Sequence, residues 1–283
     1  MCIYYRLFKG CVALKIPEQS SYSIIRLSNS ETSNENENKE YYDTYKDLDG
    51  KKLGVLAGSV FEDIIKKNFS KSTYEKYNDS FRLYKALFTG EIEGFLTDLP
   101  SAEDFQRRFP EKVSYFGENF LNNFYGFAFQ KNNNGLVNEF NNFLISINLI
   151  DIYLKWNVRD TSNLTVDKTI NSNSKKKIRV AMFPDTKPIC FEQNNDIIGY
   201  EIFLLYEFTR AKNYSIEFIT LENSGEILNY LLENKTDIAG GAFTITDERK
   251  EVVDFSYPTL FAGTSLVVSR EKRKLPWKNS SIR

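Results

Sequence analysis

The sequence lacks histidine entirely, and other residues that build reactive sites are scarce. None of the 283 residues is histidine, the side chain most often used as a general base, a metal ligand or a triad member. Three cysteines, Cys2, Cys11 and Cys190, are odd in number and lack the spacing of a metal site. We therefore expect no catalytic residue, metal or cofactor, and interpret the cysteines as small, partly buried thiols. The alternative is one disulfide between two of them, in an oxidising compartment.

Long apolar runs and a strong charge of either sign are also missing. No stretch of about 18 consecutive apolar residues occurs, and Arg6, Lys9 and Lys15 interrupt the opening residues, unlike the apolar core of a secretory signal. The sequence therefore predicts neither a membrane span nor a signal peptide. The formal net charge of -1 indicates neither a nucleic acid nor an anionic membrane as a partner.

Two polar, low-complexity stretches divide the chain. One begins at Asn29 (NSETSNENENKEYYDTYKD), and the other covers residues 159–177 (RDTSNLTVDKTINSNSKKK). Because neither can bury an apolar face, we interpret the first as a surface insertion and the second as an interdomain linker.

Around these stretches, short apolar strands alternate with helical patterns. Helices are predicted after Gly58-Ser59 and around 83–88, where Gly90 ends the helix, and at 137–156, 202–208 and 227–232. Strands are predicted at 52–56, 94–98, 125–130, 178–182, 215–219 and 237–239. This alternation predicts an α/β fold with open, mostly parallel sheets and ligands at the carboxyl ends of strands.

Polar residues near the C-terminus are suited to binding a carboxylate. Thr246 is a good N-cap, Asp247 and Glu248 suit the positive end of a helix, and Arg249 follows in the first turn. Thr244 ends the preceding strand in this interpretation. A hydroxyl, free backbone N–H groups and a guanidinium can then meet at one point. The alternative is a capped surface helix with a solvated arginine.

The longer sequence segment around these residues resembles a known protein family. Residues 237–250 (DIAGGAFTITDERK), followed by VDFSYP, closely resemble the first lobe of the family 3 bacterial solute-binding proteins, which bind amino acids between two lobes. PICF at 188–191 and GYEI at 199–202 resemble that lobe's opening strand and first helix, so the resemblance covers 178–268. It implies a two-lobed fold of the type II periplasmic-binding-protein kind, related to the ligand-binding cores of ionotropic glutamate receptors.

The N-terminal half resembles the other lobe of the same family. The matching segments are 47–59 (DLDGKKLGVLAGS), 90–98 (GEIEGFLTD) and 125–156. Family members place the first lobe before the second, whereas the order here is reversed. The segment YPTLFAG at 257–263 is similar to YYRLFKG at 4–10. This repeat suggests that the chain covers the end of one copy and the start of the next in a tandem array.

Two arrangements follow. The lobes fold together as a circular permutant, with the helices of 137–156 packing on the sheet that begins at Ile178, or each is half of a different copy. In either arrangement we predict four parts: 1–158 (crossover strand, second lobe and closing helices), 159–177 (linker), 178–268 (first lobe) and 269–283 (basic tail).

The resemblance also assigns ligand-binding roles. It implies that Arg249 and Thr244 hold a ligand's α-carboxylate, that Ser59 and the N–H groups after Gly58 complete the anion site, and that Asp98 takes the α-ammonium group. A zwitterion offers one charge of each sign, and closure of the lobes desolvates and pairs both. On the residues alone, Ser59 is more often an N-cap, and Asp98 is equally well a solvated strand-end carboxylate.

Three departures from the family pattern keep other functions open. Ile189 stands where a stacking aromatic is usual, Phe203 replaces an acidic residue of the first helix, and Ala242 stands where glycine is frequent. The leading hypothesis is an amino-acid-binding module for ABC-type uptake or for a surface sensor. It implies an extracellular or periplasm-like location and a membrane permease or receptor membrane domain as partner. The alternatives are a ligandless structural repeat and, disfavoured because histidine and an appended catalytic domain are lacking, an enzyme.

Overall fold

The structure is a computed structural model that describes residues 41–116, 122–157, 163–169 and 174–273. The described residues belong to one compact unit. Cys2, Cys11 and the proposed repeat at 4–10 lie outside the described residues. The strands are β1 (Lys52–Leu56), β2 (Thr73–Tyr77), β3 (Gly94–Asp98), β4 (Val113–Phe116), β5 (Asn122–Tyr125), β6 (Ala128–Gln130), β7 (Lys177–Met182), β8 (Asp185–Thr186), β9 (Cys190–Gln193), β10 (Asp196–Ile198), β11 (Ser215–Thr220), β12 (Ile238–Gly240), β13 (Val253–Phe255) and β14 (Leu260–Ser269).

Eight α-helices and three short 3-10 turns complete the described residues. The helices are α1 (Phe61–Asn68), α2 (Ser80–Thr89), α3 (Leu99–Arg108), α4 (Asn134–Ser146), α5 (Leu149–Trp156), α6 (Tyr200–Lys212), α7 (Ile227–Leu232) and α8 (Asp247–Val252), and the turns are η1 (Tyr45–Leu48), η2 (Ser224–Glu226) and η3 (Arg270–Lys272). Strands and helices alternate along most of the chain, so the α/β class predicted from the sequence is confirmed.

One sheet and the helices α1 to α3 form what we call the N-terminal lobe. Its strand order is β2-β1-β3-β14-β4, with β5 pairing further along β14. The pairs β1–β2 and β1–β3 are parallel, whereas β14 runs antiparallel to β3 and β4. Residues Ala262 to Val268 of β14 are all buried, as expected for a strand at the centre of a covered sheet.

A second sheet and the helices α4 to α8 form the C-terminal lobe. Its strand order is β11-β7-β12-β6-β13, with β7 parallel to β11 and β12 and with β6 antiparallel to both of its neighbours. Its core is rich in aromatic rings: Phe140 of α4 packs edge-on against Phe127 and Phe208 at centroid distances of 4.9 and 4.8 Å. Aromatic pairs of this geometry stabilise beyond their buried area.

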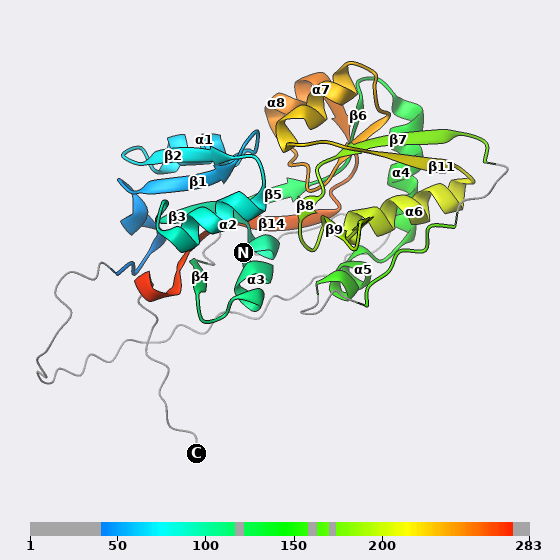
Figure 1. The fold of residues 1–283 in the computed structure, drawn as a ribbon. Helices are drawn as coiled ribbons and strands as arrows, with labels where there is room; N and C mark the ends of the chain where they lie inside the picture. The colour runs from blue at the N-terminus through cyan, green and yellow to red at the C-terminus, as the bar shows by residue number, and fades with distance from the viewer. Residues whose placement is uncertain (1–40, 117–121, 158–162, 170–173, 274–283) are drawn as a thin grey trace, which may run out of the picture. The chain divides into compact units, whose positions relative to one another are not determined.

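Each sheet takes one strand from the opposite half of the sequence. β14, from the C-terminal half, inserts between β3 and β4, and β6, from the N-terminal half, inserts between β12 and β13. β5 and β14 pair antiparallel between the two sheets, where Figure 1 shows them side by side. The two halves of the chain are therefore interleaved in the described residues.

Several local predictions are confirmed. β1, β3, β7 and β11 lie at the predicted segments. Gly90 ends α2 in the left-handed conformation (φ 73°) that glycine adopts without strain. Thr246 caps α8 by accepting a hydrogen bond from the backbone N–H of Arg249 at 3.2 Å.

Two predicted elements are each divided in two. The single strand expected at 125–130 is β5 and β6, because β5 pairs with β14 whereas β6 pairs with β12 and β13. At the break, the N–H of Gly126 donates to the carbonyl of Phe243 at 3.2 Å. The single helix expected at 137–156 is α4 and α5, because Asn148 caps a new helix by accepting from the N–H of Asp151 at 3.3 Å.

Two further predictions are wrong in part. Thr244 does not end a strand: β12 ends at Gly240, and Thr244 forms an isolated bridge with Tyr125. The polar stretch from Asn29 is not surface insertion throughout, because Tyr42 is buried and its hydroxyl donates to Glu93 at 3.0 Å. At the start of the segment predicted as a basic tail, Arg270 donates to the carbonyl of Pro110 at 3.0 Å. The boundaries at 158, 177 and 268 stay predictions.

Candidate functional site

Arg249 and Thr244 lie together at the start of α8. One guanidinium nitrogen (Nη1) of Arg249 donates to the carbonyl of Thr244 at 2.7 Å, and the guanidinium carbon lies 4.0 Å from the ring centre of Phe243. Burial lowers the pKa of Arg249 to about 10, since removal from water disfavours the charged form. Among the described residues Arg249 has no ion pair. Its remaining N–H donors suit an anion.

The loop before Thr244 is held by a buried carboxylate that the sequence analysis did not single out. Oε2 of Glu201 accepts from the N–H groups of Gly241 and Ala242 at 2.8 and 3.1 Å, and Oε1 accepts from the hydroxyl of Thr259 at 3.2 Å. Burial raises the pKa of Glu201, and these hydrogen bonds oppose that rise. Ala242 has a positive φ of 60°, so the loop adopts a backbone that favours glycine.

Asp98 is a buried carboxylate at the end of β3. Its side chain is 7% exposed, which excludes the alternative of a solvated strand-end group. Oδ1 accepts a hydrogen bond from the hydroxyl of Tyr125. Although Asp98 is the N-cap residue of α3, its side chain makes no capping hydrogen bond. Burial raises the pKa of Asp98 to about 7, opposed by a hydrogen bond from its own backbone N–H.

Ser59 lies in the turn between β1 and α1. Its hydroxyl donates to the carbonyl of Leu56 at 2.7 Å, and its N–H donates to the same oxygen at 3.2 Å. The N-cap of α1 is Val60, so the alternative role of Ser59 as that N-cap is wrong. Both polar groups of Ser59 are therefore engaged within the turn.

The turn also touches the C-terminal lobe. The hydroxyl of Ser224 donates to the carbonyl of Ala57 at 2.8 Å, and a Cβ on Gly58 would lie 2.3 Å from the Cα of Gly225. Gly58 has a positive φ of 74°. Only glycine permits both this backbone and this approach between the lobes.

Ile189 and Phe203, two of the departures from the family pattern, lie in packed surroundings. Ile189 is wholly buried, its N–H donates to the carbonyl of Thr186 at 2.8 Å, and its carbonyl accepts from the N–H of Glu201 at 3.0 Å. Phe203 is half-buried with its ring 6.4 Å from that of Trp156. The side chain of Ile189 therefore belongs to the core of the C-terminal lobe.

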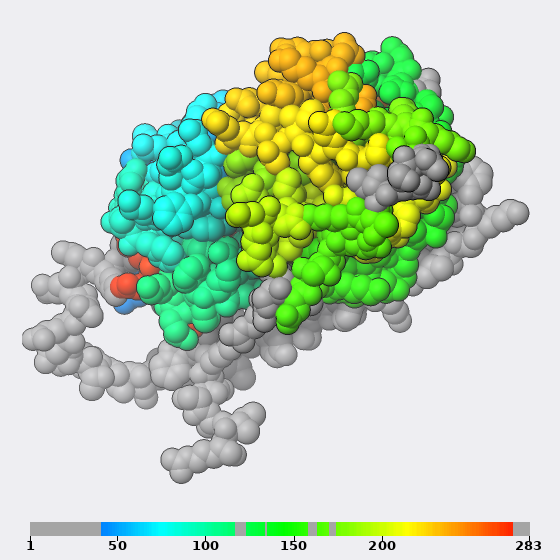
Figure 2. All heavy atoms as spheres, turned by 45° about the vertical axis from the view of Figure 1, so that its right-hand side comes forward, coloured from blue at the N-terminus to red at the C-terminus, as the bar shows by residue number. Residues whose placement is uncertain are grey.

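A cavity of about 590 Å³ lies between the two lobes. Its walls include Asp79, Ser80 and Tyr84 at the start of α2, and residues 183–185, 187 and 220–222 of the C-terminal lobe. Figure 2 shows the cyan surface of the N-terminal lobe meeting the green and yellow surface of the C-terminal lobe. As far as the chain is described, none of the six predicted site residues lines this cavity.

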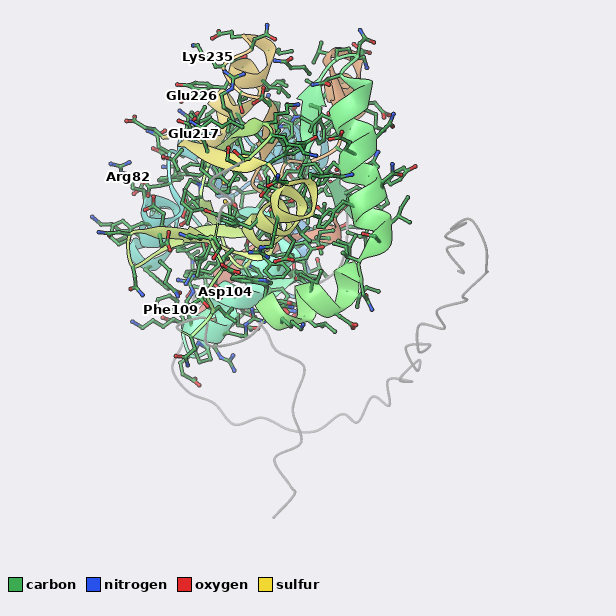
Figure 3. All side chains as sticks on the ribbon, turned by 90° about the vertical axis from the view of Figure 1, so that its right-hand side faces the viewer. Arg82, Asp104, Phe109, Glu217, Glu226 and Lys235 are labelled. Carbon is green, nitrogen blue, oxygen red and sulfur yellow. The ribbon has the colours of Figure 1, made fainter. Side chains whose placement is uncertain are left out.

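Direct hydrogen bonds join the lobes around this cavity. The N–H and hydroxyl of Ser80 donate to the two carboxylate oxygens of Asp185 at 2.6 and 2.5 Å. At α3, whose Asp104 is labelled in Figure 3, Arg107 donates to the side chain of Asn157 just after α5 at 3.0 Å. The N-terminal lobe thus contacts the C-terminal lobe through Ser80 of α2 and Arg107 of α3.

The structure gathers part of the predicted site. Thr244 and Arg249 are in contact, and Asp98 is connected to them through Tyr125, whose backbone bridges Thr244. Ala242 precedes them in the same loop but directs its N–H to Glu201. Within the described ranges, no hydrogen bond joins Ser59 or Ile189 to this group.

Tyr125 and Glu201 were missed as site residues. Glu201 carried a signal, because it shares a helix face with Leu204, Leu205 and Phe208, all wholly buried, and a carboxylate on an apolar face needs hydrogen-bond donors. Tyr125 carried none, since a tyrosine in a strand is ordinary.

The described residues contain no group of three or more side chains placed to hold a metal ion. None of the helices in these ranges has the length and apolar character that crossing a membrane requires.

Comparisons with known proteins match the C-terminal part of the chain. Residues 178–281 match the sequence profile of the bacterial extracellular solute-binding proteins, family 3. The probable amino-acid-binding protein YxeM of Bacillus subtilis is 27% identical over 104 residues, 36% of this chain and 39% of that protein. The L-cystine-binding protein TcyJ of Escherichia coli is 31% identical over 98 residues, 35% of this chain and 37% of that protein.

Among solved structures, a phosphate-binding protein of a Streptococcus pneumoniae ABC transporter aligns with a TM-score of 0.42 and 14% identity, covering 79% of this chain and 91% of that one. The chain spans about two fifths of the length of the curated relatives it matches. Residues 178–281 are therefore similar in sequence to the family 3 bacterial extracellular solute-binding proteins.

Proposed function

We propose that the chain binds a small zwitterionic amino acid between its two lobes. The observation that carries this proposal is a pair of desolvated, opposite charges connected through one residue. Arg249 of the C-terminal lobe has no ion pair among the described residues, and the buried Asp98 of the N-terminal lobe is linked to the Arg249 segment by Tyr125. A buried charge without a partner is costly, and a zwitterion supplies a partner for both.

In this proposal Arg249 pairs with the ligand's carboxylate and Asp98 with its ammonium group. Thr244, whose hydroxyl makes no hydrogen bond in the described part of the chain, adds a donor next to Arg249. Ser59 completes the anion site only after its hydroxyl leaves the carbonyl of Leu56, so its contribution requires a local rearrangement. Ala242 and Ile189 shape the loop and the core behind the site.

We further propose that the two halves of the chain form one binding unit, as a circular permutant does. The exchange of β6 and β14 between the sheets supports this arrangement, because separating the halves would leave both sheets without an inner strand. The proposed partner is a membrane permease for ABC-type uptake or the membrane domain of a receptor, at an extracellular or periplasm-like location.

A ligandless structural unit is the second candidate. It is favoured by the hydrogen bonds that join the lobes directly, such as Ser80 to Asp185 and Ser224 to Ala57, and by the burial of Ile189. In that case the lobes hold each other without a solute.

The two candidates are separated by thermal unfolding with the standard amino acids and L-cystine. A ligand that binds only the folded chain at about 100 times its Kd stabilises it by about 2.7 kcal/mol, which raises Tm. Arg249→Ala should abolish the shift. The matched control is Arg210→Ala in the same lobe, which loses ion pairs to Glu207 and Asp167 and should keep it. No shift with any compound favours the ligandless candidate.

A further inference from the structure

Tyr125 is a wholly buried tyrosine whose hydroxyl makes a hydrogen bond. Its side chain has no exposed surface, and its hydroxyl donates to Oδ1 of Asp98 in the N-terminal lobe. In the described part of the chain, no other side chain hydrogen-bonds the Asp98 carboxylate. Donation from this hydroxyl restricts the rotation of the carboxylate and favours its ionised form.

The backbone around Tyr125 is fixed to the segment that carries Thr244. Tyr125 and Thr244 form an antiparallel bridge, and the N–H of Ile245 donates to the carbonyl of Phe124 at 2.8 Å. The carbonyl of Tyr125 in turn accepts from the N–H of Thr259 at 2.8 Å. Tyr125 is thus held on both sides by the C-terminal half of the chain.

The side chain of Asp98 is directed by this contact rather than by its own helix. An aspartate at an N-cap ordinarily accepts a hydrogen bond from the first turn, but Asp98 makes none with α3. Burial without a neighbouring cation disfavours the charged form of a carboxyl group. Donation by Tyr125 therefore counteracts the effect that would otherwise neutralise it.

We propose that Tyr125 is a positioning residue of the binding site: it orients the Asp98 carboxylate for the ligand's ammonium group, in register with Thr244, and favours the ionised form of that carboxylate. This inference rests on the proposed function for its ligand. It adds a residue that acts through Asp98, and it predicts that the ammonium and carboxylate subsites are coupled through one side chain.

Other titratable groups around Asp98 are few. β14, which places Thr264 opposite Asp98, carries no charged residue along its length, and β5 contributes Tyr125. The charges of α3 begin one turn into the helix with Glu103 and Asp104, and Asp104 is paired with Arg108 at 2.8 Å. The titration of Asp98 is therefore set by its burial, by the hydrogen bond from its own backbone N–H and, in our proposal, by the hydroxyl of Tyr125.

The test compares Tyr125→Phe, which removes only the hydroxyl, with Tyr200→Phe as the matched control. Tyr200 is also wholly buried, and its hydroxyl donates to the carbonyl of Thr259 at 2.7 Å. Both variants lose one buried hydrogen bond, but only Tyr125→Phe removes the donor to Asp98. Near-ultraviolet circular dichroism establishes that each variant is folded.

The first readout needs no ligand. Carbon-detected NMR of the side-chain carboxyl groups follows Asp98 as the pH is raised, and Tyr125→Phe should raise its pKa whereas Tyr200→Phe should not. In the unsubstituted chain, the Tyr125 hydroxyl proton should be visible and protected from exchange with water. An Asp98 titration unchanged by Tyr125→Phe overturns the positioning role.

The second readout uses the amino acid that gives the largest Tm shift, together with its analogue lacking the amino group. Tyr125→Phe should weaken the amino acid's affinity about tenfold and leave the analogue's unchanged. In an Asp98→Asn background, Tyr125→Phe should have no further effect. Equal losses for both ligands would show a merely structural role. If no amino acid binds the unsubstituted chain, the proposed function fails, and the ammonium role with it, whatever the NMR titration shows.

Discussion

Asp185 of the C-terminal lobe accepts two hydrogen bonds from Ser80 of the N-terminal lobe, from its N–H at 2.6 Å and its hydroxyl at 2.5 Å. Ser80 is the first residue of α2, so its N–H is one of the donors that a helix start leaves free. A carboxylate from one lobe thus completes a helix end of the other.

Replacing Asp185 by asparagine should loosen the two lobes. The neutral amide weakens both contacts, because its oxygen accepts from the Ser80 N–H without a charge and its nitrogen can only donate to the Ser80 hydroxyl, so we expect the free energy of unfolding to fall by about 1 kcal/mol. Denaturant titration measures this change, and small-angle scattering should show a larger radius of gyration. Glu192→Gln, which lines the same cavity but is exposed, is the control. Equal scattering from all three proteins would contradict the role of Asp185.

The stability of the chain should fall as the pH rises through the range in which Asp98 titrates. Its folded pKa of about 7 is above its ordinary value of 3.8, so the folded state binds the proton more tightly between these values. Relative to Asp98→Asn, the unsubstituted chain should lose about 3 kcal/mol between pH 4 and pH 7. A stability difference that is constant with pH would show that Asp98 is not desolvated.

Affinity for an amino acid should show the opposite trend with pH. Only the ionised Asp98 attracts an ammonium group, so binding should strengthen as the pH rises through about 7 and then level off. Calorimetry at a series of pH values measures this profile. A ligand that binds equally well below and above neutrality would argue that its ammonium group lies elsewhere.

Loss of the Glu201 side chain should be among the most damaging single changes in the C-terminal lobe. Glu201→Ala leaves the N–H groups of Gly241 and Ala242 without their acceptor, removes one of the two acceptors of the Thr259 hydroxyl, and opens a cavity. We expect a loss of about 3–5 kcal/mol. Glu201→Gln keeps the size and one acceptor, so it should cost much less. Equal melting temperatures for the two variants would contradict the assigned hydrogen bonds.

Ala242→Gly should stabilise the chain. Alanine at φ 60° carries a left-handed backbone cost of about 1–2 kcal/mol, which exceeds the entropy that glycine loses on folding. A net gain of about 0.5–1 kcal/mol follows. The control is Ala211→Gly at the exposed end of α6, which should destabilise by up to about 1 kcal/mol. Destabilisation at both positions would show that Ala242 is not strained.

The sequence predicted the contacts around the candidate site where those contacts are local. Thr246, Arg249 and Thr244 lie within six consecutive residues, so the cap and the guanidinium contact follow from one helix start. The prediction failed for Tyr125 and Glu201, whose partners Asp98 and Thr259 lie far away in the chain. A buried polar side chain is recognised by its partners, and distant partners cannot be read from periodicity.

The sequence by itself determined the α/β alternation, the end of α2 at Gly90 and the cap of α8 at Thr246, because each depends on residues within about one helical turn. Only the tertiary structure decided that β14 joins the sheet of the N-terminal lobe, that β5 separates from β6 at Gly126, and that Asp98 meets Tyr125. Strand pairing and burial depend on which distant surfaces come together, and the local pattern of a strand does not name its neighbour.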